Sequence, residues 1–166
     1  MTVFQIVSLG TNDHVLVGMC QATSLNQCLH LMIRNYLPYF AFYSNDCVGR
    51  TAVSIGHWHH FAFTYDYAIQ TQYLYLDGVL ECTHGSASPF QATAGGITIG
   101  SINYPGLQLS SFWTGSIDQI SYVSRAKNAS EILDDATLVT YYSFDGGSFY
   151  DAGPNKINGV DDSGQF

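Results

Sequence analysis

Positive charge is scarce in this sequence. Of its 166 residues only 5 are Lys or Arg, against 13 Asp or Glu, so the formal net charge at pH 7 is −8. The basic residues are also scattered along the chain: Arg34, Arg50, Arg125, Lys127 and Lys156. Binding to nucleic acid or to an anionic membrane needs a basic patch, so we expect neither partner.

Long apolar runs are missing too. No stretch approaches the roughly 20 apolar residues that a helix needs to span a bilayer, so we expect no membrane insertion. The first residues, Met1 to Phe4, lack a charged segment followed by an apolar one, so no signal peptide is visible. We expect either that a signal peptide was removed or that the chain is a piece of a longer protein.

Carboxylates suited to catalysis are few. Glycan hydrolysis needs two carboxyl groups that flank the scissile bond. The only glutamates are Glu81, just after a turn, and Glu131, in a helix-capping position, while Asp134 and Asp135 form a surface pair. No GxSxG motif supports a Ser-His-Asp triad. The sequence therefore predicts a protein that is not an enzyme.

The chain has four cysteines, and their spacing does not match the CxxC pattern of metal sites. Four cysteines allow three pairings, and the sequence does not choose among them. Two interpretations stay open: buried free thiols, or one or two disulfides in a secreted protein. The residues are Cys20, Cys28, Cys47 and Cys82.

Apolar residues are plentiful, at 46% against 11% charged, which indicates one folded domain rather than disorder. The stretch His57 to Gly78 organises the chain. It contains two strand-like segments, Trp58 to Tyr65 and Tyr73 to Leu76, and ends on Asp77-Gly78. This dipeptide predicts a type I′ turn into a third strand, Val79 to Cys82. We expect these three antiparallel strands at the centre of a sheet.

Short strands are predicted along most of the remaining chain, and only one helix is credible. Asn128 can cap that helix, with Glu131 three residues later in the capping-box position. The pattern predicts an all-β fold, an antiparallel two-sheet sandwich or barrel with one short helix. The other predicted strands are Phe4 to Leu9, His14 to Met19, Leu29 to Arg34, Tyr39 to Tyr43, Thr51 to Ile55, Ile97 to Ser101, Phe112 to Ser124 and Leu138 to Phe144.

Four segments carry a resemblance to a known family. They are GHWHHFAFTYD (Gly56 to Asp66), YLYLDGV (Tyr73 to Val79), GGITIGS (Gly95 to Ser101) and GSIDQISYVSRAKNASEIL (Gly115 to Leu133). In order and spacing the chain resembles laminin-G-like (LamG, concanavalin A-like) jelly-roll domains. The resemblance implies a jelly-roll β-sandwich, but that fold hosts lectins, adhesion modules and glycanases, so it leaves function open.

One motif of this family stands in an unexpected place. Domains of this type open with a YYxFDG strand followed by DxxGxxxNG, and similar patterns lie here at Tyr141 to Gly146 and Asp151 to Gly159. We therefore divide the chain into a sandwich, residues 1–144, and a C-terminal extension, residues 145–166, that carries the displaced first-strand motif. The displaced segment closes its own sandwich, begins a further domain, or inserts into a neighbouring copy.

The segment Leu138 to Phe144 is too apolar to remain in solvent, so we expect it to complete a sheet somewhere. Closure within one chain and insertion into another copy remain alternatives. Insertion between copies would be a head-to-tail contact, and such a contact builds a filament unless it closes into a ring.

Calcium is the candidate metal. The resemblance implies Ca²⁺ binding through Asp and main-chain oxygens, with Asp118 of the GxID motif as a ligand and Asp145 as its neighbour if the C-terminal segment folds back. The alternative is that Asp118 hydrogen-bonds loop amides. For His57, His59 and His60, hydrogen bonding at the sheet margin is preferred over zinc ligation.

Aromatic faces bind sugar rings, and three loop aromatics are candidate ligand-binding residues: Tyr36, Tyr104 and Trp113. Asn128 begins an N-glycosylation sequon, Asn128-Ala129-Ser130, although a role as helix cap is preferred.

We predict a non-catalytic structural or adhesive LamG-like module, extracellular or on the cell surface, that assembles head-to-tail by strand complementation through its C-terminal segment. The alternative is a monomeric, Ca²⁺-dependent carbohydrate-binding module of lectin type.

Overall fold

The computed structural model describes residues 2–8 and 12–137. The predicted strand at residues 138–144 and the extension at residues 145–166, Asp145 included, lie outside the described residues. The elements are β1 (Thr2–Ile6), β2 (His14–Cys20), β3 (Cys28–Arg34), β4 (Leu37–Ala41), β5 (Asp46–Val48), β6 (Trp58–Asp66), β7 (Thr71–Leu76), β8 (Val79–His84), β9 (Thr98–Ile99), β10 (Ile102–Asn103), β11 (Leu109–Ser110), β12 (Gly115–Asp118) and α1 (Ala129–Ala136).

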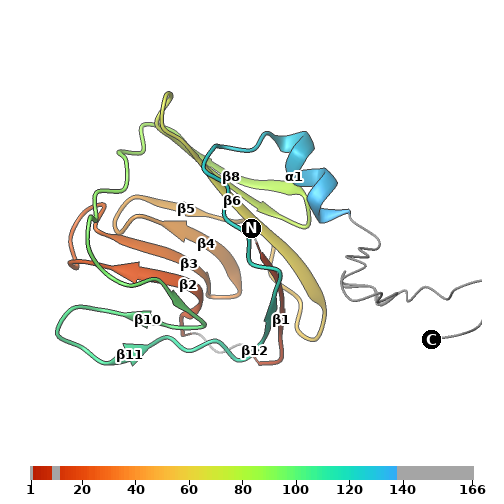
Figure 1. Ribbon diagram of the computed structural model, residues 1–166. Coiled ribbons are helices and arrows are strands. Elements are labelled where there is room, and N and C mark those ends of the chain that lie inside the picture. The colour runs from red at the N-terminus through yellow and green to blue at the C-terminus, as the bar shows by residue number, and fades with distance from the viewer. Residues whose placement is uncertain (1, 9–11, 138–166) are drawn as a thin grey trace, which may run out of the picture.

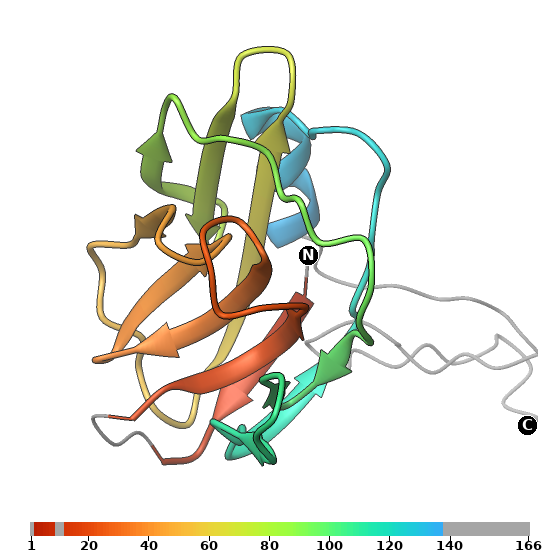
Figure 2. The ribbon, with the colours of Figure 1, turned by 90° about the vertical axis from the view of Figure 1, so that its left-hand side faces the viewer.

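Two five-stranded antiparallel sheets form the fold. We name them sheet A, with the order β12-β1-β6-β7-β8, and sheet B, with the order β5-β4-β3-β2-β9. The short strands β10 and β11 pair with each other. Figures 1 and 2 show the two sheets as separate layers, with α1 on the side of sheet A that faces away from sheet B. The predicted antiparallel sandwich with one short helix is confirmed.

The centre of sheet A forms as the sequence predicts. The β6 and β7 strands pair over residues 61–66 and 71–76, and β7 pairs with β8. Between β7 and β8 both turn residues have positive φ, +50° at Asp77 and +78° at Gly78. These are the two left-handed positions that a type I′ turn requires.

The core lies between the sheets, because alternate residues of each strand point inward. From sheet A it includes Phe4, Phe61 and Leu74, and from sheet B Leu31 and Phe40, all of them buried. Phe4 and Phe61 meet edge-on with ring centroids 6.1 Å apart, and Phe40 and Phe63 face each other across the two sheets at 5.3 Å. Aromatic packing therefore joins the two layers.

The helix begins as predicted. Asn128 caps it by accepting a hydrogen bond from the Glu131 backbone at 3.0 Å, and the Glu131 carboxylate accepts one from the Asn128 backbone at 2.9 Å. Ile132 is buried against Ala62 and Tyr75, so α1 covers the outer face of sheet A. No helix in the described part of the chain is long and apolar enough to cross a membrane.

Two predicted strands differ in the structure. Residues 51–55 are irregular, because the Glu81 carboxylate accepts the backbone N–H groups of Arg50 and Thr51 at 2.7 and 2.8 Å. The strand in this region is instead β5, at the edge of sheet B. The strand predicted from Phe112 to Ser124 shortens to β12, which pairs with β1 over residues 115–118 only.

The predicted strand from Ile97 to Ser101 shortens to β9, and β10 begins after it at Ile102. Gly100 lies between them with a φ of +72°, which is outside the range of a strand. Its N–H donates to the Leu16 carbonyl at 2.9 Å, so the chain stays attached to β2 while it turns.

All four cysteines form disulfides. Cys20–Cys28 joins the paired ends of β2 and β3, and Cys47–Cys82 joins β5 of sheet B to β8 of sheet A. Of the two interpretations left open by the sequence, the structure has the disulfides, which form in oxidising compartments.

Removing Cys47–Cys82 should destabilise the protein more than removing Cys20–Cys28. The two bonds close loops of 35 and 8 residues, and chain entropy then predicts losses of about 4 and 2.5 kcal/mol in the free energy of unfolding. The double variants Cys47→Ala/Cys82→Ala and Cys20→Ala/Cys28→Ala, compared by urea denaturation, check this. Equal losses would contradict the dominance of the link between the sheets.

Candidate functional site

In the described part of the chain, the second half of strand β6 has a strand partner along one edge only. The β7 strand pairs with residues 61–66, whereas β1 pairs only with residues 58–61. Among the described residues, no strand adjoins residues 62–66 on the β1 side. Within residues 2–8 and 12–137, sheet A thus has an open strand position in its interior, in line with β1.

The backbone of β6 is directed at this open position. His60 turns both of its backbone groups toward β7, since its N–H donates to Asp77 Oδ1 and its carbonyl accepts from the Asp77 N–H, both at 2.8 Å. In an antiparallel sheet successive residues point to opposite neighbours. The N–H and C=O groups of Phe63 and Tyr65 therefore face the open side.

A groove of about 330 Å³ lies beside this edge, and we call it the β6 groove. Figure 2 shows the connection from β12 to α1 curving away from β6 on this side of the molecule. The lining residues come from both sheets, the connection and α1: Leu29, Phe40, Phe42, Ala62, Phe63, Thr64, Tyr65, Phe90, Ser121 to Lys127 and Ile132.

The inner wall of the β6 groove is a preformed aromatic surface. Phe42 packs edge-on against Tyr65 with ring centroids 5.2 Å apart, and Phe90 lies 5.4 Å from Phe42 on the other side. The Tyr65 hydroxyl donates to the Ala87 carbonyl at 2.8 Å, which fixes the ring. Such a wall suits apolar side chains that enter between the two sheets.

The outer wall of the β6 groove carries both apolar and polar side chains. Ala62, Thr64 and Ile132 line it beneath α1. Thr64 is only 7% exposed, and within the described residues its hydroxyl has no hydrogen-bond partner. A buried hydroxyl without a partner costs free energy, so a ligand that supplies one would bind more tightly.

A neutral histidine lies just below the groove on the same outer face. His60 is buried and its pKa is lowered to about 4, because burial disfavours the charged imidazolium. Neither ring nitrogen has a hydrogen-bond partner among the described residues. His60 therefore adds no charge beside the β6 groove at neutral pH, and the charged side chains of its lining are Arg125 and Lys127.

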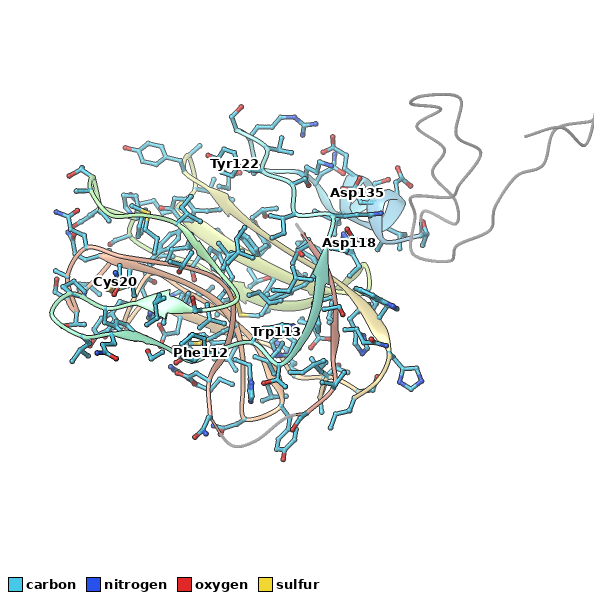
Figure 3. All side chains as sticks on the ribbon, turned by 60° about the horizontal axis from the view of Figure 1, so that its bottom comes forward. Cys20, Phe112, Trp113, Asp118, Tyr122 and Asp135 are labelled. Carbon is cyan, nitrogen blue, oxygen red and sulfur yellow. A yellow bond between two sulfur atoms is a disulfide. The ribbon has the colours of Figure 1, made fainter. Side chains whose placement is uncertain are left out.

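The predicted metal residues are not assembled into a site in the described part of the chain. Figure 3 shows Asp118 at the end of β12 that is nearer to α1. Its Oδ1 accepts the Gln119 N–H at 2.8 Å, as the alternative interpretation expects. No group of three or more His, Cys, Asp or Glu side chains with metal-binding geometry occurs in residues 2–8 and 12–137. The role of Asp118 with Asp145 stays a prediction.

The three predicted aromatic ligands lie apart. Tyr36 is 41% exposed in the β3–β4 turn, and Tyr104 is half-buried at the end of β10. Trp113 is partly buried and packs against the core, where its ring meets Phe4 edge-on with ring centroids 5.2 Å apart. Asn128 serves as the predicted helix cap, and its glycosylation stays a prediction.

Tyr104 is part of a second polar cluster on the outer face of sheet B. Its hydroxyl lies 3.3 Å from His30 Nε2. Nearby, Arg34 makes two hydrogen bonds to the Asp13 carboxylate, at 2.7 and 2.8 Å, and its guanidinium lies 4.3 Å from the centre of the Tyr39 ring. Burial and Arg34 lower the pKa of His30 to about 4, so this histidine is neutral. The cluster offers aromatic, cationic and carboxylate groups on one face.

Ser54, His59 and Asp77 have the hydrogen-bond order of a catalytic triad. His59 Nε2 lies 2.8 Å from Ser54 Oγ, and His59 Nδ1 lies 2.8 Å from Asp77 Oδ2. Neither described cavity reaches these residues. We interpret the arrangement as structural, because it ties the start of β6 to the β7–β8 turn, as the sheet-margin interpretation of His59 expects.

The sequence did not identify the β6 groove. The available signal was length: the nine residues of β6 exceed the five of β1, so part of β6 had to remain without this neighbour. No local motif marks the position, because strand pairing is decided by segments far apart in the chain.

The fold defines a class, the antiparallel β-sandwich of jelly-roll type. Residues 10–133, well over half of the chain, match the family model described as the concanavalin A-like lectin/glucanases superfamily, of laminin G type. The chain therefore belongs to this family, as the resemblance implied. The match ends at residue 133, so the displaced motif near the C-terminus stays a prediction. No curated protein matches the chain.

Two solved structures are similar in fold. One is a protein from Bacteroides ovatus with a provisional carbohydrate-binding assignment, at 16% identity and a TM-score of 0.65, over 95% of this chain and 49% of that one. The other is a heptameric SAP-like pentraxin from Limulus polyphemus, at 12% identity and a TM-score of 0.60, over 82% of this chain and 68% of that one. This chain thus spans about half the length of the Bacteroides protein.

Replacing Asp77 with Asn should cost more stability in mild acid than in alkali. The hydrogen bond to Asp77 raises the pKa of His59, and this pair holds the pKa of Asp77 below its usual value although burial acts to raise it. The His59 contribution is full below about pH 6.5 and is lost as pH rises through its folded pKa, while the Asp77 contribution is lost only as pH falls through its lowered pKa.

Urea denaturation of the wild type and Asp77→Asn at pH 5.5 and 8.5 measures this difference. Asn keeps the positive φ of the turn and can still accept the His60 N–H. A loss of equal size at both pH values would show that the ion pair contributes nothing.

Proposed function

We propose that this chain is a non-catalytic structural or adhesive module of the extracellular space, which joins like units by accepting a β-strand in the β6 groove. The observation that carries this proposal is the half-paired edge of β6 beside an apolar groove. Strand addition is a known mode of recognition, in which main-chain hydrogen bonds give affinity and side-chain pockets give specificity.

The dimensions of the groove suit a strand. The open edge covers residues 62–66, and five residues at about 3.4 Å each give a length of about 17 Å. Phe63 and Tyr65 supply main-chain donors and acceptors in the alternating pattern of an antiparallel ladder. The volume, about 330 Å³, is at the low end for a small-molecule site, and a small ligand would leave those main-chain groups without partners.

The lowered pKa values of both glutamates argue against glycosidase chemistry. Hydrogen bonds from Arg50 and Thr51 hold the pKa of Glu81 below its usual value although burial acts to raise it. The ion pair with Arg125 lowers the pKa of Glu131 to about 2. A general acid needs a raised pKa, so neither residue is suited to protonate a leaving group. This supports a binding or building role.

Two disulfides support an extracellular or cell-surface location. They form and persist in oxidising compartments and are rare in the cytosol.

Blocking the β6 groove should abolish association between copies. Ser124 lies on its wall, and a Trp there would occupy the space that a strand needs. The wild type is expected to associate with rising concentration in light scattering, and Ser124→Trp to remain monomeric. Ser130→Trp, on the exposed surface of α1, is the matched control and should behave like the wild type. Association of Ser124→Trp equal to that of the wild type would refute the proposal.

The second candidate function is carbohydrate binding at the outer face of sheet B. The observation that favours it is the cluster of Tyr104, Arg34, Asp13 and Tyr39, because aromatic rings beside charged groups can stack on and hydrogen-bond to sugars. The provisional assignment of the Bacteroides protein points the same way, at the level of fold.

If this face binds glycans, Tyr104→Ala should weaken binding to any glycan that the wild type retains on an array, by about tenfold or more for a lost stacking contact. Tyr67→Ala is the control, since Tyr67 is 73% exposed in the β6–β7 turn. Repeating the measurement in EDTA tests the calcium prediction for Asp118 and Asp145. Retention of binding by Tyr104→Ala would exclude this face.

A further inference from the structure

The β6 groove sets three conditions on the strand that fills it. The strand must be about five residues long, to match the open edge. It must present apolar side chains toward Phe42, Tyr65 and Phe90 on the inner wall. On its other face it should carry a hydroxyl, since Thr64 Oγ1 lacks a partner in the described part of the chain.

The direction in which the strand runs along β6 is a fourth condition. The β1 strand runs antiparallel to both β6 and β12. The open position continues the line of β1, so a strand there that keeps the sheet antiparallel must run as β1 does. It has to enter beside Asp66 and finish beside Thr2. Antiparallel pairing is also slightly more stable per residue than parallel pairing.

The segment at residues 138–144, Leu-Val-Thr-Tyr-Tyr-Ser-Phe, meets the sequence conditions. As a strand it would place Leu138, Thr140, Tyr142 and Phe144 on one face and Val139, Tyr141 and Ser143 on the other. The first set suits the aromatic inner wall, and the second set supplies hydroxyl groups for the Thr64 side. The segment has no charged residue to bury.

Within one copy, this segment would start at the wrong end of the groove. A Cβ on Gly78 would lie 2.8 Å from Leu133 Cδ1 and 3.2 Å from the Ala136 Cβ, so α1 ends over the β7–β8 turn. That turn adjoins His60, which is the Thr2 end of the groove. To enter beside Asp66, the chain would first have to run back about 17 Å, which uses about five of the seven residues.

We propose that the β6 groove holds residues 138–144 of a second copy of this chain, paired antiparallel with residues 62–66 of β6. This inference rests on the proposed strand-acceptor function and names the partner of that site. Every copy then has one donor segment and one acceptor groove, so the contact is heterologous. It builds an open chain of copies or, if the rotation between copies closes, a ring.

A pair of complementary full-length variants tests this inference. Ser124→Trp blocks the acceptor groove but keeps the donor segment. Tyr142→Asp keeps the groove but places a carboxylate where the aromatic wall must be met, which should weaken donation at least about 100-fold. Each variant alone is expected to be monomeric in light scattering, and an equimolar mixture should form a 1:1 heterodimer that grows no further. Tyr150→Asp, outside the proposed segment, is the donor control and should assemble like the wild type.

The outcomes separate this inference from the function on which it rests. If Tyr142→Asp assembles like the wild type while Ser124→Trp does not, the groove accepts another strand: the proposed function stands and the named segment is wrong. If Ser124→Trp also assembles, both are wrong. If the wild type is monomeric and Tyr142→Asp lowers its unfolding midpoint, the segment fills the groove of its own copy, which overturns the role of a second copy. A monomeric wild type that Tyr142→Asp leaves unchanged overturns both.

Discussion

A strand inside a β-sheet needs hydrogen-bonding neighbours along both edges, and the structure depends on how far this condition is met for β6. On the β7 side the ladder is continuous through the turn at Asp77 and Gly78. On the β1 side it stops at Phe61. The same strand places Phe61 in the core and lines the groove with Phe63 and Tyr65. One strand therefore holds the sandwich together, while the main-chain groups of Phe63 and Tyr65 have no strand partner among the described residues.

The parts of the fold that could be predicted from sequence are those decided by neighbouring residues. The Asp77-Gly78 turn and the Asn128–Glu131 capping box are local chemistry, and the structure has both. The predicted strand at residues 51–55 failed because a distant carboxylate, that of Glu81, accepts the N–H groups of Arg50 and Thr51. Pairing to residues thirty positions away leaves no mark in the local pattern of apolar residues.

The candidate sites show the same difference between features decided by neighbouring residues and features decided by distant ones. Trp113 has a loop-like sequence context, yet its ring lies against Phe4, a residue more than a hundred positions earlier in the chain. The β6 groove combines residues from β3, β4, β6, the connection after β12 and α1. No sequence motif could have identified the β6 groove. That residues 138–144 need a partner stays a prediction from composition, because these residues lie outside the described part of the chain.

The Cys47–Cys82 bond has a mechanical consequence. It ties β5 to β8, the strands at one margin of sheets B and A, and Phe40, which lines the β6 groove, pairs directly with Cys47. The two layers are thus linked covalently at this margin. A separation of β5 from β8 would have to break this bond, whereas in the described part of the chain the other strands of the two sheets are held together by packing of the shared core.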